Sequence, residues 1–449
     1  MSASTSAHAE SRLLTRLAAV IGLTVVFAIL FVTDRGAAHD DSSFGAVAAV
    51  GFLLLGGMLG AQLLEVFKLP HLTAYILVGV VAGPHVLHLV DHETVKQLSP
   101  VNTLALALIA LAGGVELQLP MVMAQRRSLS YAMTIHALFG GVLATGAFML
   151  SAPFLPFARG QSLSVIIGIA ALWGGLAVSR SPSATLAILS ETRPDGPITR
   201  FALAFVMSSD IVVAVLMSLV IALVRPLIEP LSGISLRDVQ HLGHELLGSM
   251  TLGMTLGFAL SLYLWLVSGQ LLLVLIAIGF GLTAGLRYLH FDPLLTFLMA
   301  GFVVSNLSAQ GPKLLHAVEA TGSIVFVVFF ATAGAHLDLP LLGRLWPVAL
   351  ALAGGRIAIT LIAHHLAGWL AKDDPIIRRW GWAPLISQAG LTLGLSAVVE
   401  TAFPSFGSAF RSLVIATVAI NEIIGPIVFK AVLERTGEVG KAKAHSVAE

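Results

Sequence analysis

Long apolar runs recur along the chain from Leu14 to Ala431, and only short polar stretches separate them. Backbone groups in lipid must find hydrogen-bond partners within their own segment, so apolar runs of about twenty residues form transmembrane helices. Only 11% of the residues are charged, against roughly 25% in an average soluble protein. The pattern predicts an all-α polytopic membrane protein embedded in the lipid bilayer.

Hydropathy windows predict about 13–14 transmembrane helices. The expected ranges are 13–33, 45–67, 71–89, 100–118, 129–154, 161–190, 199–225, 242–268, 270–289, 292–308, 313–336, 342–370, 378–400 and 406–433. The first range follows Arg12 and could instead be a signal peptide. Its length and the lack of a small-residue cleavage site favour a retained helix.

Basic residues indicate the orientation of the helices. If both termini are cytoplasmic, the loops on that side carry more Lys and Arg than the opposite loops. Examples are Arg126, Arg127, Lys372, Arg378, Arg379, Lys441 and Lys443. Because positive charge is retained on the cytoplasmic side, we expect both termini in the cytoplasm and the protein in the cell inner (plasma) membrane.

The chain contains an internal repeat. LAGGVELQLPMV, from Leu111 to Val122, aligns without a gap with ATAGAHLDLPLL, from Ala331 to Leu342. Two further pairs flank this match in the same order: PHLTAYILVG resembles DPLLTFLMAG, and RFALAFVMSSD resembles RSLVIATVAIN. Three matches in one order favour a duplication over a chance likeness between helices rich in Leu, Gly and Ala.

The helix count places equivalent helices seven apart, so the two repeats cross the membrane in opposite directions. Inverted repeats are typical of secondary transporters, whose substrate site lies near the midplane where the halves meet. We expect an N-terminal segment with an extra transmembrane helix at 1–40, repeats at 41–226 and 270–434, a linker helix at 227–269 and a cytoplasmic tail at 435–449.

Two segments are candidates for broken helices, whose freed carbonyls and dipole ends bind ions in such transporters. In LAVSRSPSATLAIL (176–189), Pro182 removes a backbone donor, and three serines can form compensating hydrogen bonds, namely Ser179, Ser181 and Ser183. In LISQAGLTLGL (385–395), Gln388 and Gly390 interrupt the apolar run. An ordinary proline kink is the alternative for the first segment, and an unbroken helix is the alternative for the second.

One carboxylate lies near the middle of an apolar helix. Asp210 is the only ionisable residue from Phe201 to Val224, and a charge at the bilayer centre costs roughly 3 kcal/mol. Asp210 either pairs with a buried arginine or binds a cation and a proton in turn, because burial disfavours its charged form. We expect hydroxyl oxygens to complete a cation site there, from Ser209, Ser181 and Ser183.

Other polar residues in apolar helices are candidates for supporting this site, Gln388 among them. Arg356 keeps its charge and needs a partner, so we expect it to form an ion pair with a deep carboxylate, either Asp210 or Glu422. Arg180 either faces a pore or offsets a helix C-terminus, and Glu422 is expected to pair with Arg180 or Arg356. We expect Asn421 to bond to the broken helix across the symmetry axis.

The remaining residues and motifs indicate no cofactor. His136 is either a proton relay or a satisfied buried histidine, whereas four residues near helix ends receive no metal assignment: His364, His365, His336 and Asp338. The chain has no cysteine, and it contains no Walker, dinucleotide-binding or HExxH motif, so thiolate metal sites, ATP drive and zinc chemistry have no support. A net charge of +1 gives no nucleic-acid signature.

Three motifs resemble the monovalent cation:proton antiporter superfamily, which includes sodium/proton exchangers and Kef-type potassium efflux systems. LPHLTAYILVGVVAGP is similar to its LPxxxGYLLAGILLGP-like stretch. LALIALAGGVELQLP is similar to its LLFLVGLELD-like helix, and VVFFATAGAHLDLP to the FFVSVGLxLDL-like counterpart. The resemblance covers about residues 45–433.

The resemblance implies a homodimer in which a core bundle with two crossed broken helices moves like an elevator against a dimerisation domain. It also implies a shared cation and proton site at Asp210 and matches the family's basic residue to Arg356. Family members often have Asn-Asp, Asp-Asp or Gln-Asp at this site, whereas here Ser209 precedes Asp210. With one carboxylate in the pair, we expect electroneutral one-for-one exchange.

This chain departs from the family elsewhere too. Arg180 and Ser181 precede Pro182 where many exchangers have Thr-Asp-Pro, and Leu391 stands where Kef systems have a Glu. We expect no C-terminal nucleotide-binding domain, so regulation by such a domain would need a separate subunit.

The sequence thus predicts a secondary active transporter, not an enzyme, that exchanges Na⁺ or K⁺ for H⁺. The alternative on the same fold is a sodium-coupled symporter of an organic solute, which would need a larger cavity beside Asp210. The chain contains no GxSxG-type elbow, so the sequence does not support an intramembrane enzyme that uses serine and histidine. A channel-like or sensory protein that has lost transport is a further alternative, because of Ser209 and Arg180.

Overall fold

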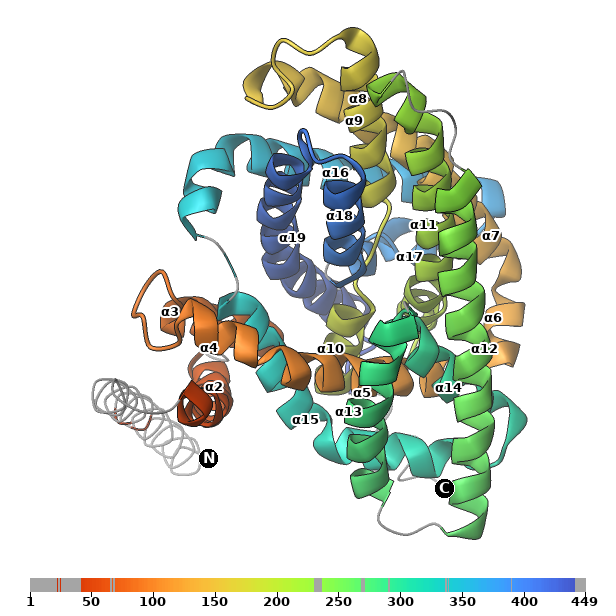
Figure 1. Cartoon of the computed structure of the whole chain (residues 1–449). Coiled ribbons are helices and arrows are strands. Elements are labelled where there is room, and N and C mark those ends of the chain that lie inside the picture. The colour runs from red at the N-terminus through yellow and green to blue at the C-terminus, as the bar shows by residue number, and fades with distance from the viewer. Residues whose placement is uncertain are drawn as a thin grey trace, which may run out of the picture. The chain divides into compact units, whose positions relative to one another are not determined.

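The computed structural model describes residues 42–64, 69–229, 236–267, 271–289, 291–335, 339–388 and 390–440, with residues 22, 25, 67 and 337. Within these ranges the chain is built from helices and short connections, and they contain no strand (Figure 1). The helix expected at 13–33, except for residues 22 and 25, and the pair His336 and Asp338 lie outside the described residues.

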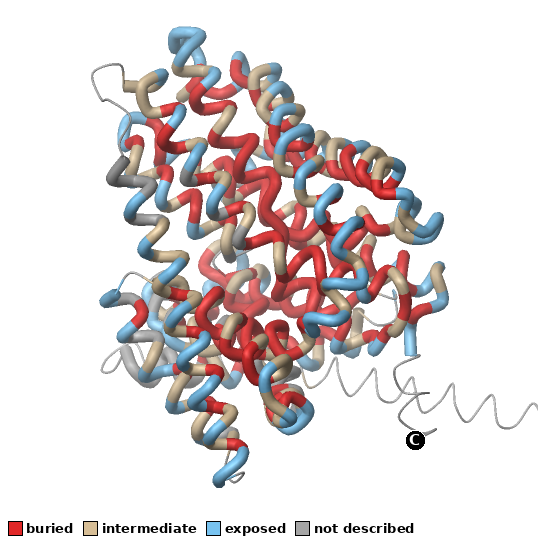
Figure 2. Tube along the Cα trace, turned by 90° about the vertical axis from the view of Figure 1, so that its right-hand side faces the viewer, coloured by how far each residue is buried: buried red, intermediate tan, exposed pale blue. Residues whose placement is uncertain are grey.

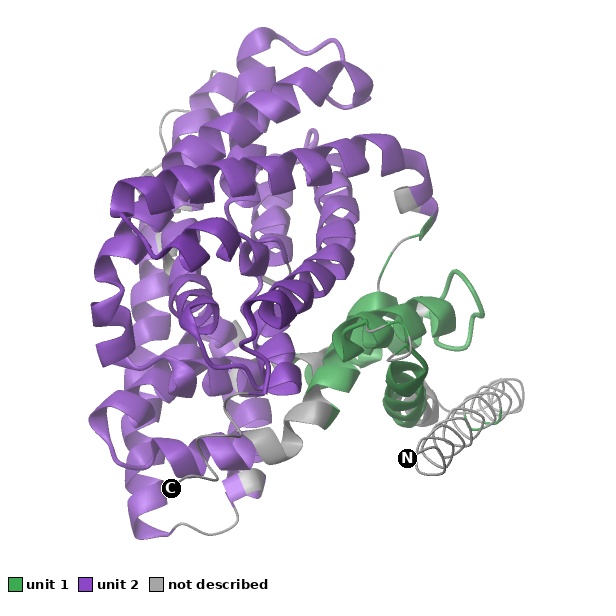
Figure 3. Cartoon of the chain, turned by 180° about the vertical axis from the view of Figure 1, so that it is seen from behind, with its two compact units in different colours: residues 1–106, 321–339 green, residues 107–320, 340–449 purple. Residues whose placement is uncertain are grey.

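The chain divides into two compact units (Figure 3). Unit 1 comprises residues 1–106 and 321–339, and unit 2 comprises residues 107–320 and 340–449. The described helices of unit 1 are α2 (Ser42–Leu64), α3 (His71–Ala82) and α4 (His92–Gln97), with the first part of α5 (Ser99–Glu116) and the last part of α15 (Gly311–Ala335).

Unit 2 holds the remainder of α5 and α15 and most of the long helices. In chain order its other elements are α6 (Leu119–Ala124), α7 (Arg126–Ile135), η2 (His136–Gly140), α8 (Gly141–Ser151), η3 (Ala152–Phe154), α9 (Leu163–Ala177), α10 (Pro182–Thr192), α11 (Pro197–Ile228), α12 (Leu236–Leu266), α13 (Leu271–Leu289), α14 (Pro293–Leu307), α16 (Leu339–Ala371), α17 (Pro375–Trp380), η4 (Ala383–Leu385), α18 (Gly390–Ala402) and α19 (Gly407–Thr436).

Six stretches of the described residues, built from helices, are long and apolar enough to cross a membrane. They are Arg126–Phe154, Leu163–Thr192, Pro197–Ile228, Gly243–Leu266, Gly343–Ala371 and Gly407–Thr436. Shorter apolar helices of 10–17 residues accompany them, among them α3 and α14. Large apolar side chains remain exposed along α12, as at Phe258, Leu262 and Trp265, where lipid can cover them. The multi-pass helical architecture expected from the sequence is confirmed.

Most helix ends fall within a few residues of the predicted ranges, and the differences have local causes. The expected span 129–154 is formed by α7, α8 and a π-helical turn between them, η2, which widens the helix at His136. The short helices α4 and α6 were not predicted, because six residues are too few to give a periodic pattern.

Glycines let helices cross at close range in unit 1. A Cβ atom at Gly79 of α3 would overlap with the carbonyl oxygen of Ala331 on α15. A Cβ atom at Gly334 of α15 would overlap with the carbonyl oxygen of Ile76 on α3. The two backbones are in direct contact, and only glycine fits at these two positions.

The same crossing recurs in unit 2, between α5 and α14. A Cβ atom at Gly301 would overlap with the Leu111 carbonyl oxygen, and one at Gly114 would overlap with that of Leu298. In the alignments of the repeats, the four residues of the α5–α14 crossing are equivalent to the four residues of the α3–α15 crossing. Equivalent sequence positions therefore make equivalent contacts, which supports the duplication, whereas the repeat bounds 41–226 and 270–434 stay predictions.

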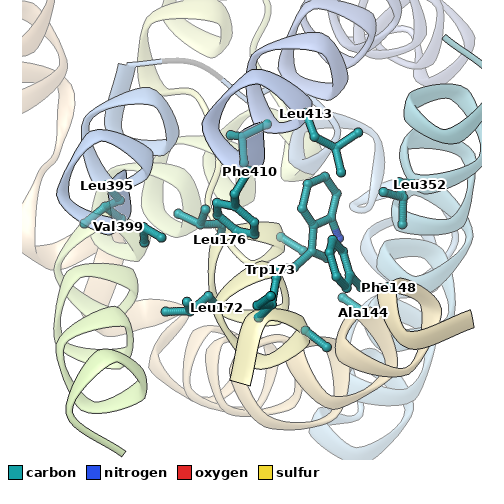
Figure 4. Packing of buried hydrophobic residues seen from close by; sticks show 14 of the residues in the cluster. Ala144, Phe148, Leu172, Trp173, Leu176, Leu352, Leu395, Val399, Phe410 and Leu413 are labelled. Carbon is teal, nitrogen blue, oxygen red and sulfur yellow. The ribbon is translucent and has the colours of Figure 1, made fainter. Parts of the chain in front are cut away.

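An apolar core of unit 2 lies between α8, α9, α11, α16, α18 and α19 (Figure 4). Its centre is aromatic: the ring of Trp173 lies 5.5 Å from that of Phe148 and 6.2 Å from that of Phe410. Leu176, at the last turn of α9, belongs to the same cluster, as does Leu395 of α18. Figure 2 shows buried and exposed positions alternating along the helices, as expected where one face of a helix lies in a core. The core thus fixes the helix segments on which the polar site is built.

Candidate ion-binding site

The first predicted break is present between α9 and α10. Residues 178–181 are not helical, and α10 begins with Pro182 in its first turn. The extended Ser181 is the N-cap, and its hydroxyl accepts a hydrogen bond from Ala184 N at 3.1 Å. Proline at the first helical position needs no hydrogen-bond partner for its nitrogen, so this sequence starts a new helix rather than kinking an old one.

The second predicted break is also present. The 3₁₀ turn η4 ends at Leu385, residues 387 and 388 are not helical, and α18 begins at Gly390. Helix α19 passes directly beside this break, because Gly425 has no side chain and a Cβ atom there would overlap with Ser387. Figure 1 shows α18 and α19 running side by side. Both broken-helix predictions are confirmed.

The two breaks meet. The amide of Gln388 donates to the Leu176 carbonyl oxygen at 3.1 Å and to the Ser179 hydroxyl at 3.3 Å. The hydroxyls of Ser179 and Thr392 are hydrogen-bonded to each other. Asn421 of α19 donates its amide to Gln388 Oε1 at 2.8 Å. Gln388 and Asn421 therefore connect the crossing. Asn421 binds the second break, which belongs to its own repeat, and reaches the first break across the symmetry axis only through Gln388, so the expected direct bond to the first break is not present.

Arg356 binds backbone carbonyls from both breaks. Its guanidinium donates to Ala177 O at 2.9 Å, Ser179 O at 2.7 Å, Ile386 O at 2.6 Å and Leu385 O at 3.3 Å. The expected ion pair with Asp210 or Glu422 is wrong, since none of the salt bridges between described residues involves Arg356. The freed carbonyls of two helix ends carry enough negative partial charge to hold the cation.

Arg180 occupies the same helix end. It is 2% exposed, and its guanidinium donates to Ala177 O at 3.1 Å and Ser179 O at 2.8 Å. Its third contact is His136 Nδ1, at 3.1 Å. Of the two expected roles, the one that offsets a helix C-terminus is therefore confirmed. The expected pairing of Glu422 with Arg180 or Arg356 is wrong, because both guanidinium groups bind carbonyl oxygens instead.

Asp210 lies on α11, and its side chain has no arginine partner. It is 7% exposed, and within the described part of the chain neither of its carboxyl oxygens has a hydrogen-bond partner. Of the two alternatives for Asp210, the structural carboxylate paired with a buried arginine is therefore wrong. A buried acceptor without donors is costly unless a proton or a cation satisfies it.

The three candidate hydroxyls are bonded within their own segments. Ser209 donates to Val206 O at 2.8 Å, and the hydroxyls of Ser181 and Ser183 lie 3.2 Å apart. Each hydroxyl oxygen keeps a lone pair that can still accept or ligate. Their role as ligands stays a prediction, because no hydrogen bond connects them to Asp210 among the described residues.

Sequence reasoning missed Asp292. It caps the N-terminus of α14, accepting from Leu295 N at 2.7 Å, and its own N–H donates to the Ser249 hydroxyl of α12 at 2.8 Å. The signal was present as an acidic residue before the proline that starts an apolar helix, but only the packing of α14 against α12 gives Asp292 its contact with Ser249.

The histidines belong to the packing around Arg180. His364 Nε2 contacts Ile377 O at 2.8 Å, and its ring lies 6.3 Å from that of His136. His365 Nδ1 contacts Leu361 O at 2.9 Å. Within the described ranges, no three side chains of His, Cys, Asp and Glu are grouped closely enough to hold a metal ion.

This chain is similar in sequence to a known protein family and to a known protein. A family model described as "Sodium/hydrogen exchanger, transmembrane" matches residues 50–435. A protein from Paramagnetospirillum magneticum named "Iron transporter MagA" is 24% identical over 430 residues, covering 91% of this chain and 89% of that protein.

Two solved structures share the fold. The sodium proton antiporter MjNhaP1 from Methanocaldococcus jannaschii, determined at pH 8, superposes with a TM-score of 0.63 and 16% identity over 87% of this chain and 96% of that chain. A second structure of the same antiporter, from an electron-microscopy map, gives a TM-score of 0.64 and 14% identity over 88% and 96% of the two chains.

Proposed function

Since this chain belongs to the transmembrane sodium/hydrogen exchanger family, we propose that it exchanges a monovalent cation, Na⁺ or K⁺, for H⁺, with Asp210 as the group that both ions share. One observation carries the proposal. Asp210 is a buried carboxylate whose two oxygens have no hydrogen-bond partner among the described side chains and backbone, on a helix that packs against the broken segment α10.

A single carboxylate is enough to couple the movement of the cation to that of the proton. A buried carboxylate is neutral when it holds a proton and is neutralised when it holds a monovalent cation, so the two ions compete for it. In a secondary transporter that opens to one side at a time, this competition couples the two fluxes in opposite directions.

The two arginines narrow the choice of ligands. The carbonyls freed at the end of α9 and before the second break already accept hydrogen bonds from Arg356 and Arg180. These oxygens are therefore satisfied without a bound ion. Carboxylate and hydroxyl oxygens near Asp210 are the groups left for a dehydrated cation, and we propose Ser209, Ser181 and Ser183 as the hydroxyl ligands.

The protein named an iron transporter makes a divalent metal ion the second candidate. Iron would favour a site with several carboxylate or imidazole ligands. The described residues hold no such group of three, which favours the monovalent cation. A sodium-coupled symporter of an organic solute remains the alternative on this fold.

We further propose that the exchanger works as a homodimer in the cell inner membrane, with both termini in the cytoplasm, and moves its broken helices by an elevator-type displacement. The crossing of the two breaks supports this movement, because Gln388, Asn421 and Arg356 connect both breaks into one polar cluster. Such a cluster can move as one body.

The test is proton flux across everted membrane vesicles on addition of Na⁺, K⁺ or Li⁺. The wild type is expected to release protons with Na⁺ or K⁺, and Asp210→Asn is expected to abolish the response, because an amide cannot alternate between a proton and a cation. Glu434→Gln is the matched control, since Glu434 is exposed on α19. Retained flux in Asp210→Asn would refute the site, and solute uptake without proton counterflow would favour the symporter.

A further inference from the structure

A second carboxylate is buried without a partner in unit 2. Glu422 lies on α19 and is 7% exposed, and no described group forms a hydrogen bond with either of its carboxyl oxygens. Glu422 has no role in the proposed exchange through Asp210. An isolated negative charge in such a place is strongly unfavourable, so Glu422 holds a proton in this conformation.

The charged groups on the helices around Glu422 have other partners. On α10, Glu191 forms an ion pair with Lys430 of α19 at 2.7 Å. On α18, Glu400 forms an ion pair with Arg411 of α19 at 2.6 Å. The 3₁₀ turn η4 contributes no ionisable residue, and Arg356 and Arg180 bind carbonyl oxygens. None of the salt bridges between described residues involves Glu422.

Glu422 also lies where α19 contacts the second break. The preceding residue, Asn421, donates to Gln388, and Gly425, one turn after Asn421, packs against Ser387. Movement of the break therefore changes the surroundings of Glu422 directly. Through the repeat, Asn421 corresponds to Asp210, so the two unpartnered carboxylates lie on equivalent helices and one position apart.

We propose that Glu422 is a second proton-binding site of the transport cycle, so that two protons, one on Asp210 and one on Glu422, are exchanged for each cation. This inference rests on the proposed function and deepens it. Asp210 releases its proton to bind the cation, whereas Glu422 releases its proton to water on the side to which the site opens. Each cycle then moves one net positive charge, so the exchange is electrogenic and the one-for-one expectation is replaced.

Purified protein in proteoliposomes tests this stoichiometry with Na⁺ and, separately, K⁺ as the probe. Cation uptake is measured with a radioactive tracer, proton release with a pH-sensitive dye, and the transport current on a solid-supported membrane. The wild type is expected to release two protons per cation with a sustained current. Glu422→Gln is expected to release one proton per cation and to lose the current, whereas the control Glu434→Gln behaves as the wild type.

The outcomes separate the two proposals. A wild-type ratio of one proton per cation without current would overturn the second site and leave antiport through Asp210 intact. A ratio of two protons per cation that persists in Glu422→Gln would also overturn the second site and leave antiport through Asp210 intact. Absence of any cation-coupled proton movement in the wild type would overturn both. A wild-type ratio of one proton per cation overturns the second site even if Glu422→Gln fails to fold, and Glu422→Asp, which keeps the carboxyl group, is expected to retain two protons per cation.

Discussion

At the scale of single residues, the site is organised by positive charges that bind backbone rather than carboxylates. Arg356 donates to carbonyl oxygens from both breaks, and Arg180 binds two of the same oxygens. Carbonyls at helix C-termini have no partner within the helix, and a planar guanidinium can reach several of them at once. Among the described residues, this arrangement leaves Asp210 and Glu422 without counter-charges, as their proposed roles in binding protons and a cation require.

Arg356→Lys tests this role, because an ammonium group cannot span both breaks as the guanidinium does. Hydrogen bonds from charged groups contribute about 1.5–3 kcal/mol each, so we expect the free energy of unfolding to fall by about 3 kcal/mol or more. Thermal unfolding of the solubilised protein, followed by tryptophan fluorescence, measures the loss. Arg344→Lys, at an exposed position of the same helix, is the control. Equal melting temperatures for Arg356→Lys and the wild type would contradict the assignment.

Which of these residues were foreseeable depends on what a sequence displays. Asp210, Arg356 and Glu422 were found because ionisable groups are rare in apolar helices. The partner of Arg356 was predicted wrongly. A sequence shows which side chains are charged, but it does not show which backbone carbonyl oxygens lose their hydrogen bonds where a helix is broken. Asp292 was missed for a related reason. Its sequence position indicates only a helix cap, and its contact with α12 depends on how α14 packs.

At the scale of elements, the segment that follows α19 caps the start of α11, the helix that carries Asp210. The buried carboxylate of Glu438 accepts from Ile198 N and Thr199 N, both at 2.9 Å, and from the Thr199 hydroxyl at 2.7 Å. Gly196 makes room for it, because a Cβ atom there would overlap with the carboxylate. A negative charge at a helix N-terminus satisfies unpaired N–H groups and interacts favourably with the helix dipole.

Glu438→Ala is therefore expected to lower the free energy of unfolding by about 1–2 kcal/mol, and Glu438→Gln by less, because the amide keeps an acceptor but loses the charge. Thermal melting in detergent compares them. Glu434→Ala serves as the matched control, since it removes an exposed glutamate from the last turn of α19, four residues before Glu438. If both alanine variants melt alike, the cap does not contribute as inferred.

The breaks themselves show how far an element can be predicted. Pro182 with a serine before it is a helix start, and the first break follows from it. The second break has no proline at the start of α18, and the sequence left it open. Its cause is tertiary: Gln388, Asn421 and Arg356 satisfy the backbone and side-chain groups that the break exposes.

At the scale of the whole molecule, the duplication explains why the fold was predictable from three short matches. Repeated segments keep the residues on which helix crossings depend, so Gly114 and Gly334 occupy equivalent positions in the α5–α14 and α3–α15 crossings. In each crossing the added methyl group would overlap with a backbone carbonyl rather than with a flexible side chain. The backbone can move away only by separating the two helices.

Gly114→Ala and Gly334→Ala are therefore expected to destabilise the protein to a similar degree, by about 3 kcal/mol or more, since overpacking against backbone has no cheap relaxation. Gly354→Ala is the control, because nothing lies within 4 Å of its added methyl group. It is expected to leave the melting temperature unchanged or slightly raised, as alanine favours helix over glycine. Melting curves and the yield of folded protein measure all three. A large loss in only one of the first two variants would show that the crossings are not equivalent, and would count against the duplicated architecture on which the proposed alternating access depends.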